Sequence, residues 1–127
     1  MSTDSPDVNS ERHKLKDFAM RVRVTMTGEC KCDICGIRPG VEYHEVVSRG
    51  RTQGAPDDVR LASYQPAICA LLCQQCHMQI APTTAGRKII LEKLIWLFGI
   101  KKVLECLYAI PEKYRRGIEI PTGGEDE

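Results

Sequence analysis

Two Cys-x-x-Cys pairs, CDIC at 32–35 and CQQC at 73–76, constrain the fold of this 127-residue chain more than any other feature. Each pair can form a knuckle that presents two thiolates to one ion, and two knuckles complete the tetrahedral shell that zinc prefers. Because a shell of four thiolates has no open position, zinc bound there is structural, and its binding energy is folding energy. The predicted ligands of this zinc ion are Cys32, Cys35, Cys73 and Cys76.

The seven cysteines also allow other interpretations. A buried lone cysteine behaves as a small hydrophobe, and Cys-x-x-Cys occurs in thioredoxin-like redox proteins, although neither pair here has the βαβ surroundings of that role. Cys30 and Cys69 lie close enough in sequence to replace a zinc ligand, but the two-residue spacings are better. Cys106 sits on the apolar face of the last long helix and is predicted to belong to the core.

The setting in which the cysteines act is predicted to be intracellular. The first residues, MSTDSPDVNSERHK, are polar and lack the apolar stretch of a signal peptide. An odd number of cysteines fits poorly with complete disulfide pairing, and paired cysteines in a reducing compartment more often hold metal. The longest apolar stretch, 89–100, contains Glu92 and Lys93 and is shorter than the ~20 residues of a membrane span. We expect a cytoplasmic protein, in a host cytoplasm if it is phage-encoded, with no membrane partner.

The pattern of apolar residues and turn residues predicts an α+β fold. Apolar residues at three- and four-residue steps predict a helix from residue 9 or 10 to Met26, ended by Gly28, with its apolar face at Leu15, Phe18, Ala19, Val22 and Met26. Residues 41–48 favour a strand, 49–60 read as a loop, and AICALL reads as a short strand or an approach to the second knuckle.

The second half of the chain is predicted to be helical. CQQCHMQIA begins a helix that Pro82 ends, and the segment 86–110 is a helix that Gly99 splits or bends and Pro111 stops. The predicted organisation is one domain over 10–118, with a flexible stretch at 1–9 and a disordered acidic tail at 119–127.

The charge of the chain is unevenly distributed. All 18 lysines and arginines lie between residues 12 and 116, together with only 10 of the 17 acids, which leaves an excess of eight positive charges there. A zinc ion with four thiolates lowers this excess by two. Such a body attracts nucleic acid, but an ordinary solvated surface accounts for the same charge equally well.

The segment 30–82 resembles the zinc-knuckle branch of the HNH endonucleases, a family with many short phage-encoded members. The first Cys-x-x-Cys, then HEVVSRG, then LLCQQCH carry the resemblance. It implies a ββα-metal core and hydrolysis of DNA phosphodiesters, with a catalytic Mg²⁺ or Mn²⁺ separate from the structural zinc. A histidine on the first strand would act as general base on a water, while the cation stabilises charge on the phosphate and the leaving oxygen.

Position by position, the resemblance is incomplete. His44 stands at the place of the base, and His77 matches a ligand of the catalytic cation. Tyr43 replaces an Asp or His ligand, Ile68 replaces a positioning Asn, and Ala81 replaces a second His.

An acidic residue is the expected substitute for the missing ligands. Glu42 and His44 share one face of the predicted strand, whereas Glu45 faces the other side, so Glu42 is the better oxygen donor. Asp57 and Asp58 are further candidates.

Both histidines have structural alternatives: His44 as a solvent-facing strand residue, and His77 as a cap on the knuckle. Three arginines flank the segment after the predicted base and suit phosphate through their forked guanidinium groups; these are Arg49, Arg51 and Arg60. The missing ligands also motivate a second function, in which a catalytically degenerate module of this type binds nucleic acid or a protein partner, with 86–110 as docking surface.

Overall fold

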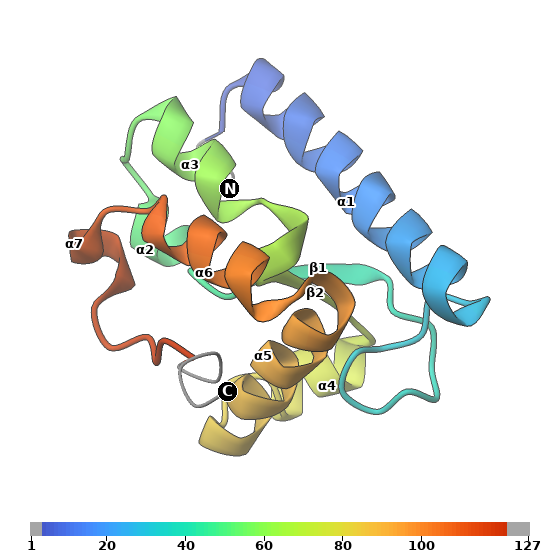
Figure 1. Ribbon diagram of the computed structural model, residues 1–127. Helices are drawn as coiled ribbons and strands as arrows, with labels where there is room; N and C mark the ends of the chain where they lie inside the picture. The colour runs from blue at the N-terminus through green and yellow to red at the C-terminus, as the bar shows by residue number, and fades with distance from the viewer. Residues whose placement is uncertain (1–3, 122–127) are drawn as a thin grey trace.

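The computed structural model of the chain describes residues 4–121 and consists of a two-stranded antiparallel sheet between helices (Figure 1). This agrees with the predicted α+β class. In chain order the elements are α1 (Pro6–Thr27), β1 (Glu42–Glu45), α2 (Arg49–Thr52), α3 (Asp57–Ser63), the 3₁₀ turn η1 (Pro66–Ile68), β2 (Cys69–Leu72), α4 (Gln74–Gln79), α5 (Thr84–Phe98), α6 (Ile100–Tyr108) and α7 (Glu112–Arg115).

The sheet carries residues from both halves of the central segment. Strands β1 and β2 pair antiparallel, with Glu42 opposite Leu72 and His44 opposite Ala70. Figure 1 shows α1 on one side of the sheet and α4 and α5 on the other. Because side chains alternate along a strand, each strand contributes to two different environments. The order strand, strand, helix places α4 directly after β2, next to β1.

Helix α1 begins earlier than the sequence pattern predicts. The Ser5 hydroxyl accepts a hydrogen bond from the Val8 N–H at 3.2 Å, and Pro6 occupies the first turn. A serine cap followed by proline is a strong start signal, so residues 6–9, predicted to be flexible, are helical. The helix ends where predicted, at Gly28, which has φ 90° and donates its N–H to the Val24 carbonyl. Residues 1–3 lie outside the described residues.

The buried face of α1 differs from the predicted apolar stripe. Ala19 is buried, but Phe18 and Met26 are 47% and 50% exposed. The side of α1 that meets the rest of the protein instead carries Arg12 and Arg23, whose guanidinium groups pair with carboxylates. Ion pairs therefore replace part of the apolar contact on which the prediction relied.

Residues 49–60, predicted to be a loop, form α2 and the start of α3. Pro56 precedes the first turn of α3, and the two acids there suit the positive end of a helix. These helices are four and seven residues long, too short for periodicity to be visible in the sequence. This is why turn residues dominated the prediction.

The main core lies on the side of the sheet that faces α5 and α6. Fully buried residues there include Ile68, Leu72, Leu94, Val103 and Leu107, and the buried Cys106 joins them as predicted. Gly99, with φ 87°, separates α5 from α6, which confirms the predicted split.

The chain after α7 is described as far as Pro121. Ile118 and Ile120 pack against the main core, and residues 122–127 of the predicted acidic tail lie outside the described residues. Within 4–121, no helix combines the length and the apolar character needed to cross a membrane.

Candidate metal centre and active-site cleft

The four predicted zinc ligands converge. The sulfur atoms of Cys32, Cys35, Cys73 and Cys76, here called the cysteine cluster, all lie within 4.8 Å of one another. Cys35 Sγ and Cys73 Sγ are 4.0 Å apart, close to the ~3.8 Å that a tetrahedral shell with Zn–S bonds of ~2.3 Å requires and about twice a disulfide bond. The cluster is therefore a metal-binding arrangement compatible with structural zinc.

Local hydrogen bonds shape both knuckles. Cys73 caps α4, and its sulfur accepts the Cys76 N–H at 3.4 Å. In the first knuckle, Cys32 Sγ accepts the Ile34 N–H at the same distance. Backbone N–H groups directed at sulfur favour the thiolate form that binds metal.

The contacts and pKa values of the cluster cysteines favour the binding of a cation. The guanidinium of Arg38 donates to Cys73 Sγ at 3.2 Å and reaches Cys76 Sγ at 3.9 Å. This contact, helped by the Cys76 N–H, lowers the pKa of Cys73 to about 6, whereas burial raises the pKa of Cys76 to about 12. The thiolate form of Cys76 is therefore disfavoured, and a bound dication would favour it. Sequence reasoning missed Arg38, although it stands in the turn of the first knuckle.

Two of the remaining cysteines donate hydrogen bonds outside the cluster. Cys30 Sγ donates to the Gly40 carbonyl at 3.4 Å, and Cys69 Sγ donates to the Ser63 carbonyl at 3.3 Å. Among residues 4–121, the cysteine cluster is the one group of three or more His, Cys, Asp or Glu residues whose ligand atoms lie close enough to share an ion.

A buried ion pair fixes the first knuckle to α1 and β2. Arg23 donates to both carboxylate oxygens of Asp33, at 3.0 and 2.7 Å, and the side chains are 2% and 0% exposed. Asp33 also accepts the Leu71 N–H at 2.8 Å. One carboxylate between two cluster cysteines thus joins three parts of the chain, a role that sequence reasoning did not assign.

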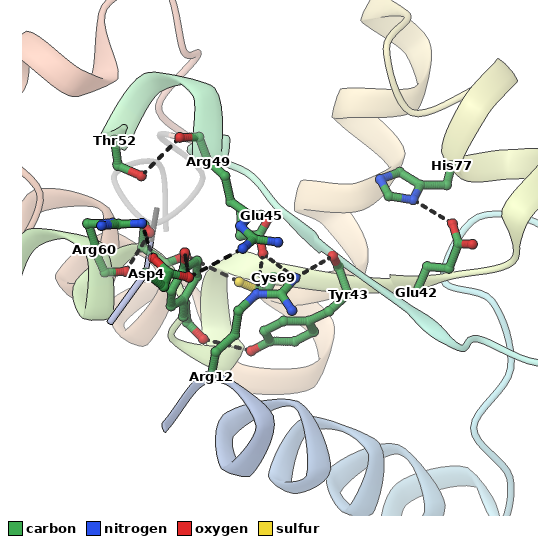
Figure 2. A network of polar contacts seen from close by, with 12 residues as sticks. Asp4, Arg12, Glu42, Tyr43, Glu45, Arg49, Thr52, Arg60, Cys69 and His77 are labelled. Atoms are coloured by element: carbon green, nitrogen blue, oxygen red, sulfur yellow. Dashed lines mark hydrogen bonds and ion pairs between the residues drawn. The ribbon is translucent and has the colours of Figure 1, made fainter. Parts of the chain in front are cut away.

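The face of β1 toward α4 brings together the predicted catalytic residues. His77 Nδ1 lies 2.7 Å from Glu42 Oε1, as Figure 2 shows, and the rings of His44 and His77 meet edge to face with centroids 5.0 Å apart. Burial, with the neighbouring His77 as second cause, lowers the pKa of His44 to about 4. His44 is therefore a neutral imidazole near neutral pH and can accept a proton.

The other face of β1 is turned toward α1. Glu45 accepts hydrogen bonds from Arg12 at 2.6 and 3.0 Å, and the Tyr43 hydroxyl donates to the Tyr64 carbonyl at 2.7 Å (Figure 2). The side chains of β1 therefore alternate between the two faces as predicted, and the Glu45 carboxylate is hydrogen-bonded to Arg12. Tyr43, at the position where the family places a ligand, faces away from His77.

A cleft of about 590 Å³ opens beside His44. Arg51 from α2 and Arg87 from α5 border it, together with Ala81 and the segment Gly117–Glu119. Two positions where the resemblance to the HNH endonucleases predicts polar residues carry buried apolar side chains: Ala81 is 1% exposed and Ile68 is fully buried.

Only one of the three predicted phosphate-binding arginines lines the cleft. Arg51 does so, whereas Arg49 pairs with Asp4 and lies over the Tyr64 ring. Arg60 is buried and pairs with Asp4, so its described contact is structural, and its contact with phosphate stays a prediction. Asp57 and Asp58 begin α3 and do not line the cleft. Arg87 also lines the cleft, from a helix beyond the segment that carries the resemblance, so no local pattern distinguished it from the other basic residues of that helical segment.

No protein-family model, curated protein or solved structure matches this chain.

Proposed function

We propose that the protein is a metal-dependent nuclease of HNH type that hydrolyses DNA phosphodiesters in the cleft beside His44. The observation that carries the proposal is the meeting of three side chains: Glu42 and His44, from the strand after the first knuckle, and His77, from the helix of the second knuckle. They lie at one end of a strand–strand–helix unit that the cysteine cluster holds together.

His44 supplies the base in this proposal. Its neutral imidazole lines the cleft, where it accepts a proton from the water that attacks phosphorus. Arg51 borders the same cleft and donates N–H groups to phosphate oxygens, which develop charge as the bond breaks. Both roles use side chains that retain contact with solvent.

His77 and Glu42 are the residues that would hold a catalytic cation. An imidazole and a carboxylate suit Mn²⁺, and Mg²⁺ favours the oxygen donor. When bound, such a cation supplies charge stabilisation at the scissile phosphate. The donor set is small, because catalytic sites commonly use three protein ligands.

One observation favours a second function, a module that binds nucleic acid without cutting it. His77 and Glu42 are hydrogen-bonded to each other at 2.7 Å, so each occupies one of the other's two potential ligand atoms. In that case the cleft and its arginines act in binding alone.

Plasmid nicking with added Mn²⁺ or Mg²⁺ separates these functions. We expect nicking by the wild type, equal nicking by a control His13→Ala variant on the exposed face of α1, and a loss of about 10²–10⁴-fold in His44→Ala. Equal activity in His44→Ala would remove His44 as the base. Binding of DNA by the wild type without nicking under either metal would favour the second function.

A further inference from the structure

We propose that Arg51 and Arg87 together bind the sugar-phosphate backbone of duplex nucleic acid in the cleft, and that the cleft does not read base sequence. This deepens the proposed function, on which it rests for the identity of the ligand. The arginines come from α2 and α5, which are far apart in the sequence, yet both side chains border one cleft with His44. Both are exposed to solvent.

Each arginine is held in place by backbone carbonyls. Arg51 Nη1 donates to the carbonyls of Tyr114 and Arg116. Arg87 donates through Nη1 to the carbonyl of Pro82 and through Nη2 to the Thr84 hydroxyl. Because a guanidinium has five N–H donors in a rigid fork, these bonds orient the group and leave further donors. A side chain fixed in this way loses less entropy when it binds a phosphate.

Among residues 4–121, the rest of the cleft lining offers few groups that recognise bases. Its other polar side chains include the hydroxyls of Ser48 and Thr84 and the carboxylate of Glu45, which Arg12 already binds. The described lining residues include no Phe, Tyr or Trp on which a base could stack, and no Asn or Gln for paired hydrogen bonds to adenine. Contacts of this kind position a backbone and carry little sequence information.

An exposed acidic residue of the cleft provides a test in which substitution is expected to strengthen binding. Glu119 borders the same cleft and is exposed. Its carboxylate repels a phosphate bound there, so removing the charge strengthens binding. A variant that is merely misfolded cannot bind more tightly, which separates this effect from loss of structure.

The test measures binding by fluorescence anisotropy in zinc-loaded His44→Ala protein, which prevents cleavage. The probes are two 20-base-pair DNA duplexes of unrelated sequence and one of their single strands. Into this background we add Arg51→Gln, Arg87→Gln or Glu119→Gln, and as matched control Arg21→Gln, an exposed arginine of α1 outside the cleft. Thermal melts confirm that each variant is folded.

We expect each cleft arginine variant to weaken duplex binding about 5- to 30-fold and to reduce the salt dependence of log K by about one unit. Glu119→Gln tightens binding, and Arg21→Gln changes it less than about twofold. The two duplexes bind within about threefold of each other and more tightly than the single strand.

Three results would overturn the inference: arginine variants that bind like Arg21→Gln, duplexes that differ more than tenfold, or tighter binding of the single strand. These are distinguishable from failure of the proposed function. If the wild type nicks DNA and both arginine variants bind it normally, only the inference about Arg51 and Arg87 is contradicted. If binding depends on the arginines but no nicking occurs, the inference holds and the proposed nuclease function is contradicted.

Discussion

The two faces of β1 differ in how completely their polar groups are satisfied. Toward α1, Tyr43 and Glu45 are buried, and each is bonded to a fixed partner. Toward α4, Glu42 and His44 are half-buried, and the Glu42 side chain is 39% exposed against 8% for Glu45. A face whose polar groups are all paired contributes to the fold, whereas a face with partly exposed donors and acceptors retains capacity for a ligand.

The partners on the two faces also differ in chemistry. Toward α1 the acids meet arginines, Glu45 with Arg12 and Asp33 with Arg23, which stay charged at every physiological pH. Toward α4 the acid meets His77, whose ring can exchange a proton or bind a metal. Permanent pairs suit a scaffold, and exchangeable pairs suit chemistry.

The test with the largest expected effect removes one ligand of the cysteine cluster, which joins α4 to the first knuckle. Because structural zinc sites contribute about 10–16 kcal/mol of binding energy and domains are stable by only about 5–15 kcal/mol, Cys76→Ala should not fold at 25 °C. The matched control is Cys106→Ala, a buried cysteine outside the cluster. It should bind zinc and lose about 1–2 kcal/mol.

Far-ultraviolet circular dichroism and zinc content by native mass spectrometry check this expectation. A Cys76→Ala protein that is folded and free of zinc would show that packing alone holds α4 in place. The cysteine cluster would then not be needed to support the site on the α4 face.

The next test breaks the scaffold on the α1 side. Asp33→Asn leaves the buried Arg23 guanidinium without a charged partner, and breaking a buried pair in this way costs about 3–5 kcal/mol. Urea denaturation measures the change. The control is Asp17→Asn, an exposed acid of α1, which should stay within about 0.5 kcal/mol of wild type. Equal small losses in both would mean that the ion pair does not fix α1.

These two tests also separate what sequence could predict from what it could not. The cysteine cluster was predictable because two short local spacings define a tetrahedral site whatever lies between them. The pairing of α1 with the sheet was not, because Arg12, Arg23 and Asp33 look like solvated charges until the chain brings them together. The predicted apolar stripe failed for this reason, and Phe18 lies outside the contact.

The candidate site, like the fold, was only partly predictable from the sequence. Alternation along a strand placed Glu42 and His44 on one face, and the resemblance added His77. Arg87 and the edge at Gly117–Glu119 come from elements with no motif, so only the fold brings them to His44. The burial of Arg60 against Asp4 could not be predicted, because a buried arginine and a phosphate-binding one have the same sequence signature.

A matched pair of substitutions compares the two faces directly. Glu45→Gln removes the charge that two N–H groups of Arg12 bind, and hydrogen bonds to charged groups contribute about 1.5–3 kcal/mol. Glu42→Gln, on the half-exposed face, should cost less than about 0.5 kcal/mol. Urea denaturation of both zinc-loaded variants tests the difference. Similar losses in the two variants would contradict the division of β1 into a scaffold face and a site face.

The last test concerns the proton affinity of His44. Burial places its pKa at about 4, against about 6.5 for an unfolded histidine. As pH falls, the unfolded chain therefore takes up this proton first. The stability contributed by neutral His44 is complete above pH 6.5 and is lost as pH falls toward 4.

Histidine ring signals followed by NMR across this range measure the pKa directly, with His44→Asn to assign the resonance. We expect the signal of His44 to move near pH 4, well below an ordinary histidine. A midpoint near 6.5 would mean that the ring is solvated in the way that an exposed strand residue is. The α4 face of β1 would then hold a solvated histidine, and burial of the His44 ring would no longer be part of the contrast between the two faces of β1.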